Sequence, residues 1–284
     1  MAERLFVRLE GDPVYAPETG VPPGTMRELA VPAVLQAHVA HMLWYEEAIP
    51  EGEERIERVL PDGAVHLILE LGDGAAQPVL RVAGPSAAPV VLRMRGHIRG
   101  LSATLQPGAA AAVLGVPAAE LTDLALPLDM LWRDGAQLAA QLHEAPTDAT
   151  RARLLLHCLH RRVAAHQAAG SALARQAAAM ISRSGGSLLL RDVAGAIGTG
   201  ERRLQQLFQQ HVGLAPRTYG RLARMHQCLR LLRSLHAPRW TEIALEAGYY
   251  DQAHLANEFQ ALCGLSPTAF LAQARISGSS KTTA

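Results

Sequence analysis

The stretch IALEAGYYDQAHLANEFQALCGLSP, residues 243–267, reads as two short helices joined by a tight turn. Apolar residues share one face of the first helix, which ends at Gly248: Ile243, Ala244 and Ala247. The second helix begins at Asp251 and ends at Gly264, with an apolar face formed by Leu255, Phe259 and Leu262. Its opposite face carries side chains that form hydrogen bonds but bear little charge: Gln252, His254 and Asn257. Such a face favours a partner that offers hydrogen-bonding groups.

The same pattern occurs once before in the chain, as DVAGAIGTGERRLQQLFQQHVGLAP in residues 192–216. Matching residues stand 50 positions apart in the first helix and turn: Val193, Ala194 and Gly198 match Ile243, Ala244 and Gly248. In the second helix and the segment after it the offset is 51: Leu204, Phe208, Gln209, Gly213, Leu214 and Pro216 match Leu255, Phe259, Gln260, Gly264, Leu265 and Pro267. Thr199 and Asp251 are the expected N-caps of the two second helices. The repeat predicts two helix-turn-helix units.

Residues 216–234 between the two units, PRTYGRLARMHQCLRLLRS, predict one long amphipathic helix. A rigid helix here would fix the spacing of the two units. Two recognition helices about 34 Å apart meet successive major-groove segments on one side of B-DNA. Gln and Asn side chains can hydrogen-bond to the major-groove edge of adenine, which gives the polar helix faces a partner.

The charge of the chain divides between its two halves. Residues 171–284 hold 13 Lys and Arg against 6 Asp and Glu, whereas residues 1–170 hold 14 against 20. The basic half is therefore the candidate for a polyanionic partner, although uneven charge between two ordinary domains would give the same counts.

The composition is that of a globular protein, with 49% hydrophobic and 19% charged residues over 284 positions, enough for about two domains. The three cysteines, Cys158, Cys228 and Cys263, are far apart and predict free thiols in a reducing compartment. The sequence begins without a signal-peptide apolar region, and no window has the length and apolarity of a membrane span. These features predict a cytoplasmic protein without a membrane partner.

Residues 171–275 resemble the DNA-binding domain of AraC/XylS-type transcription regulators. The residues that carry the resemblance are Ile243, Ala244, Ala247, Gly248, Tyr249, Asp251, Gln252, Phe259, Gly264, Ser266, Pro267 and Phe270, one repeat after a matching half. The resemblance implies seven helices, with the two second helices inserted into adjacent major-groove segments.

Carried over by position, the resemblance implies base-reading residues on both recognition helices. In the first they are Arg202, Gln205 and Gln206, and in the second Gln252, Ala253, His254 and Asn257. Arg can pair with guanine, and Gln or Asn with adenine. The alternative for any exposed polar residue is simple solvation.

The second recognition helix departs from the family pattern, because residues 253–257 read AHLAN where Ser-Tyr-Phe-Ser-Arg is common, and Gln260-Ala261 replace a Lys pair. Phosphate attraction is therefore expected from arginines outside this helix. Arg202 adds positive charge beside its base-reading role, and the residues expected to contact phosphates are Arg203, Arg221, Arg224 and Arg239. The second unit is expected to contribute less affinity or to read its site more loosely.

The front half predicts a β-rich domain. Short strands broken by Gly and Pro are expected at residues 55–71, 77–84, 88–96 and 98–108, followed by helices at 109–117 and 118–132. In the resembled family such a domain is often a cupin-like barrel that senses a small molecule or mediates dimerisation. Residues 61–73, PDGAVHLILELGD, resemble the front domain of a less-studied branch of the family.

A sensing domain needs a lined cavity, and the side chains considered for it are Trp44, Tyr45, His66, Met94, His97 and Trp132, each explained equally well by core packing. Residues 148–167 predict a linker helix whose apolar face either packs on a second chain, giving a homodimer, or covers its own domain. A regulator controlled by a protein partner without a small-molecule ligand is the competing hypothesis.

An enzymatic or metal-binding role for the front domain is the remaining alternative. The pairs His38/His41 and His157/His160 have helical spacing but lack a third ligand at zinc-site spacing. Phosphate-loop, nucleophile-elbow and zinc-protease motifs are absent from the sequence. The sequence therefore predicts no catalytic residue, no metal and no cofactor.

These observations predict an α+β protein: a β-rich, cupin-like regulatory domain at 1–145, a linker helix at 146–170, an all-α, seven-helix double helix-turn-helix DNA-binding domain at 171–276, and a polar tail at 277–284. The expected function is regulation of transcription, for example activation, controlled by a small-molecule ligand or by dimerisation through the N-terminal domain. The expected partners are double-stranded operator or promoter DNA, a small-molecule effector, RNA polymerase and a second copy of the chain.

Overall fold

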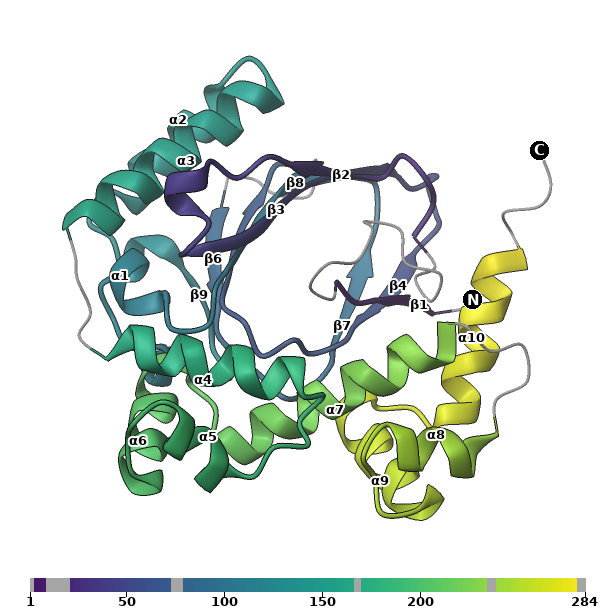
Figure 1. Ribbon diagram of the computed structural model, residues 1–284. Coiled ribbons are helices and arrows are strands. Elements are labelled where there is room, and N and C mark those ends of the chain that lie inside the picture. The colour runs from purple at the N-terminus through teal and green to yellow at the C-terminus, as the bar shows by residue number, and fades with distance from the viewer. Residues whose placement is uncertain (1–2, 9–20, 73–78, 166–169, 234–238, 280–284) are drawn as a thin grey trace.

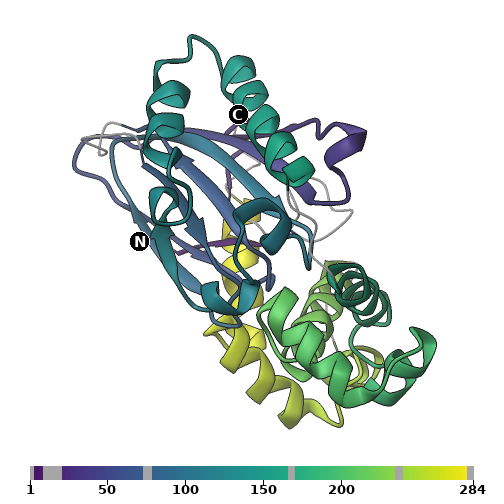
Figure 2. The ribbon, with the colours of Figure 1, turned by 90° about the vertical axis from the view of Figure 1, so that its left-hand side faces the viewer.

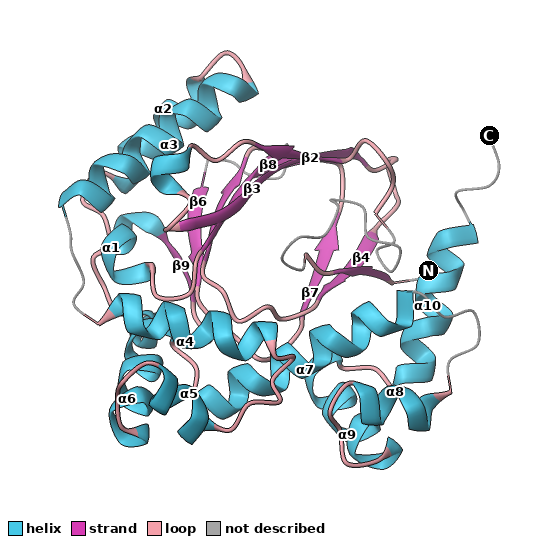
Figure 3. Ribbon diagram, in the orientation of Figure 1, coloured by secondary structure: helices cyan, strands magenta, loops and turns pink. Residues whose placement is uncertain are grey.

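The computed structural model describes residues 3–8, 21–72, 79–165, 170–233 and 239–279. Strands occupy the first part of the chain and helices the rest (Figure 3). The expected combination of a β-rich N-terminal domain with a helical C-terminal domain is confirmed.

The described strands form two sheets. Three strands make the smaller sheet in the order β1-β4-β7: β1 (Arg4–Phe6), β4 (Arg55–Val59) and β7 (Val90–Met94). Six make the larger sheet in the order β2-β3-β8-β5-β6-β9: β2 (Met26–Leu29), β3 (Val39–Ala48), β8 (His97–Leu105), β5 (His66–Glu70), β6 (Val79–Ala83) and β9 (Ala125–Pro127). All pairs are antiparallel except β1 with β4. The short strands expected between Gly and Pro breaks are thus present, although residues 73–78 lie outside the described part.

The larger sheet has one apolar face and one more polar face, as alternation along its strands requires. Leu67 and Leu69 of β5 are buried in the core of this domain together with Leu101 and Ala103 of β8. The residues between them point to the other face, where His66 lies beside Thr104 in the strand register.

Helices cover the apolar face of the larger sheet (Figures 1 and 2). They are α1 (Ala110–Leu114), α2 (Gly135–Glu144) and α3 (Asp148–Ala165), with the short 3-10 helices η1 (Ala33–Leu35), η2 (Ala118–Leu121) and η3 (Leu128–Met130). Ala152, Leu155 and Leu159 of α3 are buried in the core of their own domain. Of the two alternatives for the linker helix, its apolar face therefore covers its own domain. Residues 166–169 of the predicted linker lie outside the described part.

The prediction of a helix at residues 118–132 was wrong. This segment instead forms η2, strand β9 and η3, with Asp123 at a φ of 58°. Pro127 cannot donate a helical hydrogen bond, and β9 pairs with β6 at the edge of the larger sheet. The apolar residues that suggested a helix are buried from two short 3-10 helices, Leu121 from η2 and Leu128 from η3, with β9 between them.

Within the described residues from 170 onward there are seven helices, as the resemblance implied: α4 (Ser171–Arg183), α5 (Leu190–Ala196), α6 (Glu201–Val212), α7 (Pro216–Arg233), α8 (Trp240–Glu246), α9 (Gln252–Cys263) and α10 (Pro267–Ser279). α10 continues past residue 277, where the polar tail was expected to begin, and residues 280–284 lie outside the described part. None of the described helices combines the length and apolar character needed to cross a membrane.

The helical domain and the β-rich domain share part of one hydrophobic core. Leu5, Val7 and Leu60 of the β-rich domain belong to the buried cluster of the helical domain. The long helix α7 lies in the middle of that cluster and buries its apolar face there: Tyr219, Leu222, Met225, Leu229 and Leu232. In Figure 1 the sheets lie above the helical domain, while α6 and α9 lie at its lower side on either side of α7.

Candidate nucleic-acid interface

The helix pairs α5–α6 and α8–α9 have the same local geometry. In each turn a backbone N–H donates to a matching alanine: Thr199 N to Ala194 O at 2.9 Å, and Tyr249 N to Ala244 O at 2.7 Å. The turn glycines Gly198 and Gly248 have φ values of 70° and 80°, a region that glycine adopts without strain. The sequence repeat is therefore a structural repeat, with two helix-turn-helix units joined by α7.

The first recognition helix, α6, buries one face and exposes the other. Leu204, Leu207 and Phe208 are buried, and the 68° edge contact of the Phe208 and Tyr219 rings joins α6 to α7. The residues predicted to read bases, Arg202, Gln205 and Gln206, are all exposed. Their side chains are therefore accessible to a partner along the outer face of α6.

The second recognition helix, α9, presents a smaller polar face. Gln252, Ala253 and Asn257 are exposed, whereas His254 is half-buried. The Nδ1 atom of His254 accepts from Tyr250 N at 3.2 Å, and its ring contacts Tyr249 edge-on with centroids 5.5 Å apart. The Nε2 atom of His254 is thus left to act as the donor if this residue contacts DNA.

Sequence reasoning missed Tyr250, whose side chain is 86% exposed at the entrance to α9. It stands between Tyr249, which is buried in the core, and Asp251, the N-cap. The neighbouring Tyr249 is the one that matches the family pattern, so the sequence drew attention to the core residue and away from the exposed one.

The arginines predicted to contact phosphates have different environments. Arg203 and Arg239 are exposed, and Arg239 pairs with Glu242 at 3.0 Å. Arg221 is partly buried and its Nε donates to Glu258 of α9 at 2.5 Å. Arg224 donates from Nη2 to Gly186 O at 3.1 Å and lies over the Tyr249 ring at 5.6 Å. Arg221 thus joins α7 to α9, and Arg224 joins α7 to the loop before α5 and to the turn before α9.

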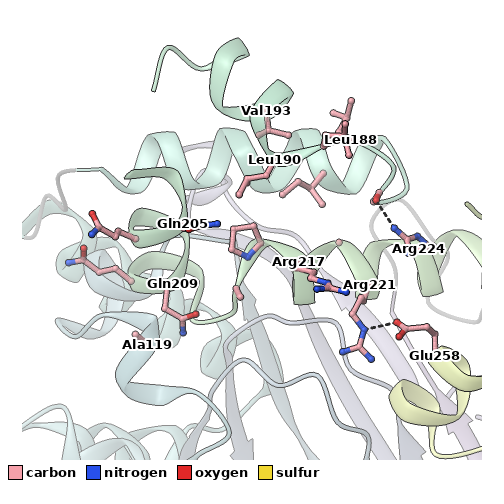
Figure 4. A pocket seen from close by; sticks show the side chains of 18 of the residues that line it. Ala119, Leu188, Leu190, Val193, Gln205, Gln209, Arg217, Arg221, Arg224 and Glu258 are labelled. Atoms are coloured by element: carbon pink, nitrogen blue, oxygen red, sulfur yellow. Dashed lines mark hydrogen bonds and ion pairs between the residues drawn. The ribbon is translucent and has the colours of Figure 1, made fainter. Parts of the chain in front are cut away.

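A groove of about 1110 Å³ runs between the two units (Figure 4). Gln205 and Gln209 lie on one wall, Arg217, Arg221 and Arg224 lie along α7, and Glu258 faces Arg221 from α9. The groove therefore brings together residues from both recognition helices with the basic side of α7.

The β-rich domain contributes one edge of this groove through Pro117, Ala119 and Glu120, at and just before η2. The exposed carboxylate of Glu120 adds a second negative charge to a groove that also holds Glu258 and the apolar side chains of Leu188, Leu189 and Leu190. The two domains are thus adjacent at the candidate interface.

The six side chains considered for a ligand cavity do not form one described site. Trp44 and Trp132 lie in the core of the β-rich domain, and the guanidinium of Arg162 lies 4.3 Å above the Trp132 ring. The Tyr45 hydroxyl donates to Leu69 O at 3.3 Å, His97 faces Glu46 at 3.1 Å, and Met94 ends β7 of the smaller sheet. Only His66 belongs to a larger polar arrangement.

That arrangement is a row of side chains across three strands of the larger sheet. Thr104 Oγ1 lies 3.1 Å from His66 Nδ1 and 3.0 Å from His41 Nε2. His66 Nε2 lies 3.1 Å from Asp62 Oδ1, which also accepts from Ala64 N at 2.9 Å. Burial alone would lower the pKa of His66, but the facing Asp62 carboxylate raises it above its usual value.

Within the described ranges, no three His, Cys, Asp or Glu side chains are grouped closely enough to hold a metal ion. His157 and His160 are exposed on α3, and His41 belongs to the polar row. Burial raises the pKa of Cys228 to about 12 and also raises the pKa of Cys263, so neither thiol is activated.

Two family models match the chain in the regions that the fold separates. Residues 193–273 match a family described as "Helix-turn-helix domain", and residues 27–127 match a family described as "Domain of unknown function (DUF6597)". No curated protein matches the chain.

Several solved structures are similar to all or part of the chain. The C-terminal domain of AraT, a response regulator from Geobacillus stearothermophilus, is 26% identical over 36% of this chain and 86% of its own, with a TM-score of 0.33. An AraC-type DNA-binding domain-containing regulator from Chromobacterium violaceum is 22% identical over 38% and 96%, with a TM-score of 0.35. ToxT from Vibrio cholerae is 11% identical over 82% and 98%, with a TM-score of 0.40.

Proposed function

We propose that this chain, a DNA-binding transcription regulator with an AraC-type helix-turn-helix domain at its C-terminal end, reads an extended operator through α6 and α9 together. The observation that carries the proposal is the structural repeat. Two units with the same turn geometry expose polar helix faces and are joined by the single helix α7.

The exposed face of α6 is the main reader in this proposal. Arg202 presents a guanidinium that can pair with O6 and N7 of guanine, while Gln205 and Gln206 can pair with N6 and N7 of adenine. On α9 the corresponding contacts come from Gln252 and Asn257, with the methyl group of Ala253 suited to a thymine methyl. His254 adds one donor.

The phosphate contacts of this interface come mostly from outside α9. α9 carries no Lys or Arg, so Arg203 of α6, Arg239 before α8 and the α7 residues Arg221 and Arg224 supply the positive charge. Phosphate contacts position a protein on DNA without reading sequence. α9 therefore contributes less to phosphate attraction than α6, α7 and the start of α8.

The N-terminal domain is the controlling part in this proposal, acting through a small-molecule ligand or through dimerisation. The polar row of His41, Thr104 and His66 supports the ligand version, because it places hydrogen-bonding groups side by side on one face of the larger sheet. A second chain or RNA polymerase would have to use surfaces other than the apolar face of α3, which its own domain covers. Action on promoter DNA places the protein in the cytoplasm.

The proposal is tested by fluorescence anisotropy on labelled DNA from upstream of the gene and on sites selected from a random library. The salt concentration would be about 0.15 M, close to physiological ionic strength, with an excess of random-sequence competitor. The proteins compared are the wild type, Arg202→Ala, Gln252→Ala and, as a matched control, Arg161→Ala, which removes an exposed arginine from α3.

Arg202→Ala is expected to weaken binding by about 1–3 kcal/mol and to relax the preference at one base pair. Gln252→Ala should relax a different base pair in the other half of the site, and Arg161→Ala should change neither. Equal weakening on every DNA sequence would make Arg202 a phosphate contact. The proposed function would be contradicted if competitor DNA abolished wild-type binding both to the upstream DNA and to the sites selected from the library.

A further inference from the structure

The β-rich domain holds the C-terminal end of the first recognition helix. α6 ends at Gly213, which has a φ of 84°, and Thr122 Oγ1 donates to Gly213 O at 2.7 Å. A Cβ atom placed on Gly213 would lie 2.5 Å from Cγ of Pro85 and 2.8 Å from Ala118 O. The helix end is therefore enclosed by the β-rich domain without room for a side chain.

The same domain also holds the end of the second recognition helix. α9 ends at Gly264, with a φ of 70°, and a Cβ atom placed there would lie 2.5 Å from Nη1 of Arg58 and 3.4 Å from Cγ of Pro89. Arg58 is itself fixed by Glu3 at 2.9 Å. Gly213 and Gly264 are matching residues of the sequence repeat, so the β-rich domain contacts the two units at equivalent points.

Between these points the β-rich domain touches the helix that joins the units. The turn at residues 61–63 lies against α7, where His226 Nε2 donates to Pro61 O at 2.9 Å. A Cβ atom placed on Gly63 would lie 2.9 Å from Cδ1 of Leu222, which leaves no space between the turn and the helix. Because Asp62 in this turn faces His66, the contact with α7 continues into the polar row of the larger sheet.

We propose that the β-rich domain sets the separation of the two recognition helices by holding the matching glycines at their C-terminal ends. This inference rests on the proposed function and specifies how the N-terminal domain acts on it. The residues assigned to bases lie in the N-terminal half of each helix, so a grip on the C-terminal ends leaves them accessible.

A fixed separation makes the protein selective for the spacing between half-sites. One inserted base pair moves a half-site by about 3.4 Å along the axis and rotates it by about one tenth of a turn. A change in the β-rich domain that weakens its contact with either helix end would widen the range of half-site spacings that the protein accepts. If α7 alone fixed the separation, weakening these contacts would leave the accepted spacings unchanged.

The test uses full-length protein with two variants in the β-rich domain, one at the contact with Gly213 and one beside Gly264. Thr122→Val removes the hydrogen bond to Gly213 with little change of shape, and Pro89→Ala removes the ring atom that encloses Gly264 on one side. The matched control is Thr147→Val, which removes an exposed hydroxyl that bonds only near the start of α3. Binding is measured on a selected operator and on versions with one base pair added or removed between the half-sites.

For the wild type and Thr147→Val, a changed spacing should weaken binding about tenfold or more, since contacts of one half-site are lost. In Thr122→Val and Pro89→Ala this penalty should shrink about threefold, the scale expected for one hydrogen bond or contact. The same penalty in all four proteins would overturn the proposal.

A second measurement does not depend on DNA. Spin labels at Gln210→Cys on α6 and Gln260→Cys on α9, in a Cys158→Ser background, report the distance between the helices. The distribution should broaden in Thr122→Val and Pro89→Ala relative to Thr147→Val. An unchanged distribution would overturn the proposal even if DNA binding is confirmed, and broadening without selective DNA binding would overturn the proposed function alone.

Discussion

Arg221 and Glu258 face each other across the groove between the two helix-turn-helix units. Their side chains are 33% and 20% exposed, so the ion pair is partly screened by solvent and contributes about 0–1 kcal/mol to stability. Its effect on DNA binding is larger in principle, because Glu258 both neutralises Arg221 and places a carboxylate near the path proposed for phosphates.

Glu258→Gln is expected to tighten DNA binding and to steepen its salt dependence by about 0.9 in the slope of log affinity against log salt, the value for one further phosphate contact. The measurement is a salt titration of operator affinity. Glu246→Gln, which changes an exposed carboxylate on α8, serves as the matched control. Weaker binding by Glu258→Gln at every salt concentration would show that the ion pair positions α9 and does not compete with DNA.

The two histidines of the polar row respond to pH in opposite directions. Burial lowers the pKa of His41 to about 4, whereas Asp62 raises the pKa of His66 against the effect of burial. A raised pKa means that His66 stabilises the fold below its unfolded-state pKa of about 6.5, and that this contribution disappears as the pH rises through the folded-state pKa. A lowered pKa means that His41 costs stability as the pH falls from about 6.5 towards 4.

His66→Gln should therefore destabilise the protein more at pH 6 than at pH 9. His41→Gln should be more favourable, relative to the wild type, at pH 5 than at pH 8. Chemical unfolding of both variants and the wild type across this pH range measures the difference. Parallel stability curves for the wild type and His66→Gln would exclude a stabilising charge on that imidazole.

At the scale of single elements, α6 and α9 begin in different ways although they belong to a repeat. Asp251 caps α9, with Oδ1 accepting from His254 N at 2.7 Å. The N-cap of α6 is Gly200, which has no side chain to accept a bond, and the expectation that Thr199 caps this helix was wrong. Gly200 matches Asp251 at the offset of 51, so the two helices start at equivalent positions and differ in the residue that stands at the cap.

Asp251→Ala is expected to destabilise the protein by about 1 kcal/mol through loss of the cap. Thr199→Ala is the matched control and should change stability much less, since Thr199 is not the cap of α6. The comparison is made by urea unfolding at constant pH. A larger loss from Thr199→Ala than from Asp251→Ala would contradict the assignment of the caps.

The elements that the sequence predicted well are those whose signals are local. The repeat, the glycines that end α6 and α9, and the apolar face of α7 follow from spacing within a few turns of helix. The error at residues 118–132 arose because β9 depends on pairing with β6, about 40 residues away, which no local period reports. For the same reason the Arg221–Glu258 pair and the contact of Thr122 with Gly213 could not be predicted from the sequence.

At the scale of the whole molecule, the shared hydrophobic core couples the two domains. Leu60 is 3% exposed and belongs to the core of the helical domain, although it directly follows β4 of the β-rich domain. A domain boundary drawn at residue 145 or 170 separates the chain in sequence but does not separate its core.

We therefore expect the protein to unfold in one transition, with Leu60→Ala lowering stability by about 2–5 kcal/mol. Leu71→Ala, buried in the core of the β-rich domain alone, is the matched control and should lower the same transition. Far-ultraviolet circular dichroism follows the helices. In a Trp240→Phe background, which removes the tryptophan of α8, fluorescence of the buried Trp44 and Trp132 follows the β-rich domain. Separate midpoints for the two signals, with only the fluorescence midpoint shifted by Leu71→Ala, would contradict this coupling.

On the proposed function, the inequality of the two recognition helices gives the operator a direction. α6 carries two arginines and α9 carries none, so one chain cannot exchange its two half-sites. On a site turned end to end, the chain must itself turn round, and the β-rich domain then faces the opposite way along the promoter. Two promoters with the same half-sites in opposite orientation would thus present different surfaces of the regulator to the transcription start. The orientation of the site, which is written in the promoter sequence, would then help to decide how each promoter responds.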